Sequence, residues 1–154
     1  VADDRWAHCN LKVISLLANI LARQQAVEVG CAEALLIRDG WLKEGAASNI
    51  FVAKNGVLLA PPKTSFMLPG ITYDIVIELA ERHGQPLEVR EIHENELRAA
   101  DEVWMTSSTK EVLAITTLDG KPVGSGPAAG KPGPLGERMW QWYQDFKNTV
   151  MRKD

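Results

Sequence analysis

Several marks of specialised protein classes are missing from this sequence of 154 residues. No apolar run approaches the roughly 20 residues that a membrane-spanning helix needs, and we see no signal-peptide pattern. Acidic residues (20) slightly outnumber basic ones (17), which gives a formal net charge of -3, and the basic residues form no stripe. We therefore expect neither a nucleic-acid partner nor membrane association.

Cysteine and histidine are also scarce. The two cysteines, Cys9 and Cys31, form no CxxC pair, and we interpret them as reduced thiols of a cytoplasmic protein. The three histidines, His8, His83 and His93, have no metal-ligand spacing such as HExxH, so we expect no metal site. The segment "GSGPAAG" resembles a glycine-rich loop, but its prolines and spacing do not suit a strand-to-helix phosphate turn, and no GxSxG motif occurs.

The residues that are present suit one globular domain. The hydrophobic content of 45% is enough for a sizeable core in a chain of this length. The first residue is not Met, and the charged stretch at residues 2–5 leads towards Lys12 with no element before it. We interpret the chain as a part of a larger protein that begins in the middle of it.

Turn signals divide the chain into short strands and a few helices. Pairs of Asp or Asn with Gly at residues 39–40, 55–56 and 119–120 each separate two apolar runs, which predicts three β-hairpins. Further strands are expected at residues 87–91 and 102–108. Apolar spacing predicts helices from Val13, over 71–83 and from Leu135, with a helical turn at 94–100. The expected fold is a mixed α/β domain with mostly antiparallel strands.

Lys12 has an unusual position in this prediction. Val13, Leu16, Leu17 and Ile20 have the spacing of a helix with one buried face, so Lys12 is expected at or just before the first turn. The partial positive charge of a helix N-terminus disfavours an ammonium group there. One interpretation is a solvent-exposed lysine that tolerates a cost of a few tenths of a kcal/mol. The alternative is an amine whose pKa is lowered, because Schiff-base chemistry needs a neutral amine.

Glu44 is a second candidate for chemistry. It follows an expected strand and precedes Gly45, a residue that lets backbone approach a ligand closely. A glutamate in a hairpin is commonly a solvated charge. If it is buried, such a carboxylate can hold a proton on a pyridine nitrogen and strengthen an electron sink.

Two further segments suit an anion. In "LPGITYD", Gly70, Ile71 and Thr72 stand at an expected helix start, where free N–H groups and a hydroxyl can hold a phosphate, although ordinary N-capping by Thr72 explains the same letters. In "MTSSTKE", four hydroxyls follow one another at the end of a strand, and a simple polar turn would also explain them. They belong to Thr106, Ser107, Ser108 and Thr109.

Taken in order, the motifs "CNLK", "EALLIRDGWLKEGAASNIF", "LPGIT" and "WMTSST" resemble the large C-terminal domain of the fold-type IV pyridoxal-phosphate enzymes, most closely the D-amino-acid (D-alanine) aminotransferases. The resemblance covers essentially the whole chain. It implies a strand-rich pseudobarrel with flanking helices, formed by residues 1–154 as the C-terminal domain that binds pyridoxal phosphate. It also implies that the family's N-terminal small domain is absent from this chain.

The resemblance implies a role for each candidate. Lys12 would form a Schiff base with pyridoxal 5′-phosphate, Glu44 would pair with the pyridine nitrogen, and Leu68 would pack against the ring. Arg5, in a strand before Lys12, would give electrostatic support near the cofactor. The phosphate would be held by Ile71, Thr72 and Ser108, and Ser107 would be a further cofactor-binding residue.

The implied reaction is transamination between a D-amino acid and a 2-keto acid, in a full-length protein that forms a homodimer. Branched-chain L-amino-acid aminotransferase and aminodeoxychorismate lyase have the same implied fold and stay open, as does a catalytically incomplete domain. One departure bears on this choice. Where the family has "EGSSSN", this chain has Ala46 and Ala47, so two hydroxyls near the expected cofactor are missing.

Overall fold

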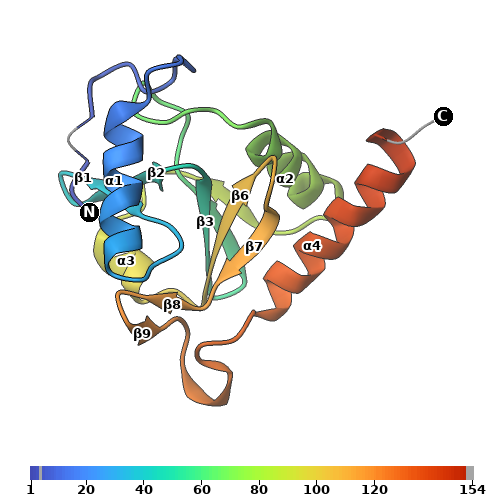
Figure 1. The fold of residues 1–154 in the computed structure, drawn as a ribbon. Helices are drawn as coiled ribbons and strands as arrows, with labels where there is room; N and C mark the ends of the chain where they lie inside the picture. Colours follow the sequence, from blue (N-terminus) through green and yellow to red (C-terminus); the bar gives the residue numbers. More distant parts are fainter. Residues whose placement is uncertain (4, 152–154) are drawn as a thin grey trace.

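The computed structural model describes residues 1–3 and 5–151, and its central feature is a five-stranded sheet (Figure 1). The strand order is β5-β4-β3-β6-β7, and only β4 and β5 run parallel. This confirms the expected mixed fold with mostly antiparallel strands. The bounds are β3 Asn49–Lys54, β4 Val57–Ala60, β5 Leu87–Val89, β6 Glu102–Ser107 and β7 Glu111–Ile115.

All three predicted hairpins are present. One joins β3 to β4, one joins β1 (Leu35–Arg38) to β2 (Trp41–Gly45), and one joins β8 (Thr117–Leu118) to β9 (Lys121–Pro122). At each turn both central residues have positive φ, for example 53° at Asp39 and 83° at Gly40. A type I′ turn requires this conformation, and Asp-Gly or Asn-Gly adopts it at low cost.

Alternating side chains give the sheet an apolar layer on each face. On one face Phe51 and Trp104 pack with α2 (Ile71–Arg82) and α4 (Pro134–Phe146), which lie side by side in Figure 1. On the other face Val52 and Val103 pack against residues from β2, β4 and α3 (Glu94–Arg98). Helix α2 agrees with the predicted helix to within one residue.

Glu102 fixes the start of α4 against the sheet. Its buried carboxylate accepts hydrogen bonds from the backbone N–H groups of Leu135 (2.9 Å) and Gly136 (2.7 Å) and from Trp104 Nε1 (3.0 Å). The first N–H groups of a helix have no partner within it, so a carboxylate from a neighbouring strand caps α4 here. Beyond α4 the chain continues as a π-helical turn, Lys147–Met151, and a 3₁₀ turn, Gly126–Ala128, precedes the helix.

The first helix differs from the prediction. Helix α1 runs over Leu17–Glu28 instead of starting at Val13, and it lies beside β1 and β2, away from α2 and α4 (Figure 1). Its buried residues are Ala22 and Ala26, which pack with Ala34, Leu36 and Ala46 in and next to the β1–β2 hairpin. The apolar face expected to be buried is exposed or half-buried. It consists of Val13, Leu16, Leu17 and Ile20.

Among the residues described, no helix is both long and apolar enough to cross a membrane.

Candidate functional site

A cavity of about 600 Å³ opens where four separate segments meet. They are the loop before α1, the end of β2, the loop that leads into α2, and the end of β6. Seven of the eight residues to which the family resemblance gives a role line this cavity, although they are spread over almost a hundred positions. They are Lys12, Glu44, Leu68, Ile71, Thr72, Ser107 and Ser108.

Lys12 lies at the cavity in an irregular loop, and its side chain is exposed. Because α1 begins only at Leu17, Lys12 is not in the first helical turn, and the expectation that it stands at a helix mouth is wrong. The field of a helix terminus falls off within one turn. The helix dipole therefore gives no reason for a neutral Lys12.

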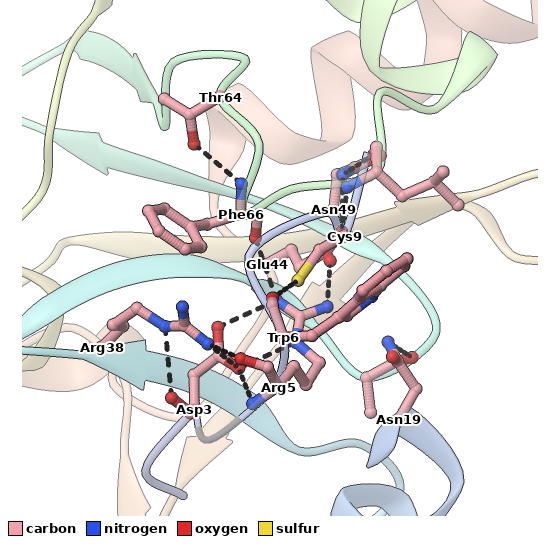
Figure 2. Close-up of polar contacts among 12 residues, drawn as sticks. Asp3, Arg5, Trp6, Cys9, Asn19, Arg38, Glu44, Asn49, Thr64 and Phe66 are labelled. Atoms are coloured by element: carbon pink, nitrogen blue, oxygen red, sulfur yellow. Dashed lines mark hydrogen bonds and ion pairs between the residues drawn. The ribbon is translucent and has the colours of Figure 1, made fainter. Parts of the chain in front are cut away.

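Glu44 is the buried acid of the cavity, and Figure 2 shows the polar groups around it. Strand β2 directs its carboxylate, which is 3% exposed, towards three donors. Oε2 accepts hydrogen bonds from the Leu68 backbone N–H at 3.0 Å and from Asn49 Nδ2 at 3.4 Å, while Oε1 forms an ion pair with Arg5. The interpretation of Glu44 as a solvated hairpin charge is therefore wrong.

Arg5 holds Glu44 in place without lining the cavity itself. Arg5 is buried and lies in an irregular segment instead of the expected strand. It is not one of the described residues that line the cavity. Its guanidinium also binds both oxygens of Asp3, at 2.8 and 2.9 Å, and donates to the Phe66 carbonyl at 2.9 Å. Arg38 approaches the same Asp3 carboxylate at 3.3 Å (Figure 2). Arg5 thus positions the Glu44 carboxylate and does not itself line the cavity where a ligand would bind.

Burial and charge compete over the protons of this network. Burial raises the pKa of the Glu44 carboxyl to about 7, although the hydrogen bond and charge of Arg5 act in the opposite direction. For Asp3, burial also acts to raise the pKa, but the contacts with Arg5 outweigh it and hold the pKa below its ordinary value. Glu44 is consequently the group that can exchange a proton near neutral pH.

The start of α2 forms another wall of the cavity. Gly70 is the N-cap residue, with no side-chain cap, and Thr72 is the second residue of the helix. The alternative in which Thr72 acts as an ordinary N-cap is therefore wrong. Helix geometry leaves the N–H groups of residues 71–73 without intrahelical partners, as an anion site needs. Thr72 is buried, whereas the Ile71 side chain is 73% exposed at the cavity.

The consecutive hydroxyls at the end of β6 and just beyond it differ in their surroundings. Ser107 Oγ accepts a hydrogen bond from the Lys110 backbone N–H at 3.1 Å and lies 3.4 Å from Thr109 Oγ1, so the polar-turn interpretation explains it. Ser108 is exposed and lines the cavity. Thr106 also lines it, is only 1% exposed, and its hydroxyl has no hydrogen-bond partner in the part of the chain that the structure describes.

Sequence reasoning gave no role to two residues beside Glu44 and Arg5, and it did not distinguish Thr106 from the hydroxyls next to it. Asn49 links Glu44 to the Leu68 carbonyl (2.9 Å), and Asp3 neutralises part of the Arg5 charge. Thr106 was only one of four consecutive hydroxyls. The position of Asn49, at the end of the "EGAASN" segment, was the one available signal. The structure also explains Gly45. A Cβ at this position would lie 2.2 Å from Ser48 Oγ, so the glycine makes room for a neighbouring side chain of the protein and not for a ligand.

A second cavity, of about 840 Å³, lies between the end of α1, β1, β7 and the β8–β9 hairpin. It is the larger of the two but contains none of the residues singled out in the sequence. The chemistry of the lining, and not its size, therefore identifies the smaller cavity as the candidate site.

Comparison with known proteins identifies the family of the chain. Residues 1–118 match the family described as amino-transferase class IV. The chain belongs to this family. It is 44% identical over 135 residues to the D-alanine aminotransferase of Bacillus licheniformis, covering 87% of this chain and 46% of that protein. It is 37% identical over 141 residues to the D-alanine aminotransferase of Listeria monocytogenes serotype 1/2a (strain 10403S), covering 92% and 47%.

The fold is also that of solved class IV members. The branched-chain amino acid aminotransferase of T.th., complexed with N-(5′-phosphopyridoxyl)-L-glutamate, superposes with a TM-score of 0.84 at 30% identity over 99% of this chain and 52% of that one. The class IV chain thus spans about half the length of the curated relatives that it matches.

Proposed function

We propose that this chain is the C-terminal, cofactor-binding domain of an aminotransferase that uses pyridoxal 5′-phosphate, with Lys12 as the residue that bonds to the cofactor. The observation that carries the proposal is the single cavity of about 600 Å³ that Lys12, Glu44, Thr72 and Ser108 line from four separate segments. An amine, a buried acid and a helix N-terminus are the three groups that this cofactor's aldehyde, ring nitrogen and phosphate require.

The residues present fit such a ligand. At one end, Glu44 is a buried carboxyl with a pKa near 7, suited to a hydrogen bond with a protonated ring nitrogen. At another, the start of α2 offers free N–H groups, and the hydroxyl of Thr106 lacks any partner in the described residues. Leu68 lines the space between them and donates its N–H to Glu44, which couples the position of this apolar wall to that of the acid.

When bound, pyridoxal phosphate supplies an aldehyde carbon and an electron-withdrawing ring. Lys12 Nζ is the amine that would hold the aldehyde carbon, with release of water. Once an amino substrate has replaced it there, the free amine would be placed to move a proton to and from the substrate α-carbon. Glu44 would hold the proton on the ring nitrogen, and Arg5 favours the ionised form of Glu44 and fixes its position.

The substrates we propose are a D-amino acid and a 2-keto acid. The higher identity to D-alanine aminotransferases, 44% and 37%, supports this choice. The branched-chain L-amino-acid reaction is the second candidate, because the fold superposes on a branched-chain aminotransferase with a TM-score of 0.84. Coupled assays of the full-length protein with D-alanine, L-leucine and aminodeoxychorismate separate these two reactions and the lyase.

We also propose that the full-length protein is a cytoplasmic homodimer in which further residues complete the site. Two observations support this. The chain covers only about half of its relatives, and the exposed side of α1 and its preceding loop is apolar at Ile14, Leu17 and Ile20. Such a surface suits a protein interface. Both cysteines are free thiols, in accord with a reducing compartment. A clean monomer at high concentration in light scattering would contradict the proposed association.

Borohydride reduction in the presence of pyridoxal phosphate, followed by peptide mass mapping, tests the function. We expect one dominant stable adduct, on Lys12. The variant Lys12→Arg should lose it, while Lys131→Arg, which changes an exposed lysine outside the cavity, should keep it. Scattered labelling of surface lysines would instead favour a non-catalytic remnant. Transamination of D-alanine by the isolated chain at a normal enzymatic rate would show that the site is already complete.

A further inference from the structure

Thr106 is the one buried side chain that the contacts of the described residues leave without an explanation. It is 1% exposed, yet its hydroxyl has no hydrogen-bond partner among residues 1–3 and 5–151. A buried polar group without a partner lowers the stability of a protein, and native structures rarely keep one without a reason. The same residue lines the candidate cofactor cavity.

The position of Thr106 in the sheet directs it towards the start of α2. In β6 the side chains alternate, so Thr106 shares a face with Trp104 and Glu102. On that face Trp104 packs in one cluster with Tyr73 and Val76 of α2. Thr106 is two residues further along the strand, and Thr72 at the start of α2 lines the same cavity.

The neighbouring polar side chain is already occupied. Across the ladder, Thr106 pairs with Asn49 on β3. The amide nitrogen of Asn49 donates to the Leu68 carbonyl and to Glu44, and its Oδ1 lies so close to Gly70 that a Cβ there would be 2.4 Å away. The backbone of Thr106 lies in the ladder with both β3 and β7. The Thr106 hydroxyl is therefore available for a hydrogen bond with a ligand that enters the cavity.

The chemistry of this end of the cavity points to an anion. Lys12 is the one cationic side chain in the lining formed by the described residues, and it stands on the loop before α1. Near α2 the available donors are neutral, namely the free N–H groups of the helix start and the hydroxyls of Thr72 and Thr106. A phosphate group accepts hydrogen bonds from such donors.

We propose that the Thr106 hydroxyl donates a hydrogen bond to the phosphate group of the cofactor at the start of α2. The inference rests on the proposed function and adds a residue to it. Thr106 is then a binding residue whose unpaired hydroxyl is kept ready for the phosphate.

The test compares two ligands and two variants in the full chain. Pyridoxal phosphate and pyridoxal differ only in the phosphate, and their dissociation constants are measured by absorbance and tryptophan-fluorescence titration. Thr106→Val removes the hydroxyl and keeps the shape, whereas Thr106→Ser keeps the hydroxyl. Thr109→Val removes an exposed hydroxyl of the same segment, outside the cavity lining, and is the matched control.

We expect Thr106→Val to raise the dissociation constant for pyridoxal phosphate about tenfold and to leave that for pyridoxal unchanged. The same variant should raise the melting temperature of the cofactor-free chain by a few degrees, since it removes an unpaired buried hydroxyl. Thr106→Ser and Thr109→Val should keep the wild-type affinity within about twofold.

Three results for Thr106→Val would overturn the inference. The first is an unchanged dissociation constant for pyridoxal phosphate, and the second is an equal rise of the dissociation constants for pyridoxal phosphate and pyridoxal. The third is a lowered melting temperature of the cofactor-free chain, which would mean that the hydroxyl is paired inside the protein. If Thr106→Val does not fold, Thr106→Ala is compared with Thr106→Ser instead. An equal rise of the dissociation constant for pyridoxal phosphate in these two variants would refute a role for the hydroxyl. Failure of the wild-type chain to bind pyridoxal phosphate at Lys12 would instead refute the proposed function.

Discussion

Replacing Glu44 with Gln should change how the stability of the cofactor-free chain depends on pH. The carboxyl is 3% exposed, and burial raises its pKa from the ordinary 4.5 to about 7. Between these two values the folded chain binds more of this proton than the unfolded chain does. The free energy of unfolding that Glu44 contributes is therefore fully present below about pH 4.5 and is lost as the pH rises through 7.

The size of the effect follows from the shift. One proton of difference changes the free energy of unfolding by about 1.4 kcal/mol per pH unit. From about pH 5 to about pH 6.5, the wild-type chain should thus lose about 2 kcal/mol relative to Glu44→Gln, which cannot titrate. Asp3 does not interfere, because contacts with Arg5 hold its pKa below 3.8, outside this range.

Urea unfolding followed by tryptophan fluorescence measures this difference at each pH. Glu81→Gln, which changes an exposed glutamate of α2, controls for the loss of one negative charge. A difference between wild type and Glu44→Gln that stays constant with pH would refute the assigned pKa. A difference that grows in favour of the wild type with rising pH would show that the ion pair with Arg5, and not burial, dominates.

Two further predictions concern the groups that hold the fold and the acid in place. Glu102→Gln should lower the free energy of unfolding by about 2 kcal/mol in urea, because two N–H groups at the start of α4 and the indole N–H of Trp104 lose their charged acceptor. Arg5→Gln should lower it by about 3–5 kcal/mol, because two buried carboxylates, Asp3 and Glu44, lose their shared cation. In both cases an unchanged urea midpoint would contradict the assigned contact.

The hairpins were predictable because their signal is local. Residues 39–40, 55–56 and 119–120 specify type I′ turns by their own conformational preferences, and all three turns form. Helix α2 was equally clear, since an apolar face and the preceding Pro-Gly pair mark its start. In such segments no distant residue changes the outcome.

Helix α1 was mispredicted because burial is decided by distant partners. The period of Val13, Leu16, Leu17 and Ile20 indicates a helical face, but it does not say which face is covered. In the structure the small side chains of Ala22 and Ala26 pack against the β1–β2 region, and this contact selects the opposite side. The loop with Lys12 is left outside the helix as a result.

For the candidate site, the sequence identified most of the residues but not the contacts between them. The motifs named positions that the structure brings to one cavity, although spacing alone does not predict the contact of residues 5 and 44 or of 44 and 68. Asp3 and Asn49 were given no role because their contacts with the Arg5–Glu44 pair appear only in the fold. Thr106 was named with three other hydroxyls, but only the structure shows that its hydroxyl, unlike that of Ser107, has no partner among the described residues.

Glu44 and Lys12, which both line the cavity, differ in how firmly the protein holds them. Glu44 is buried and fixed by Arg5, Asn49 and Leu68, so its position is set before any ligand arrives. Lys12 is exposed on a loop next to a helix that meets the β1–β2 region through alanines and one hydrogen bond from Asn19. Proton transfer at a substrate carbon is favoured when water is excluded from the reacting amine. Under the proposed function, the chain would supply the reacting amine and a preorganised acid, and we expect the exclusion of water around the amine to require the further residues proposed for the full-length protein.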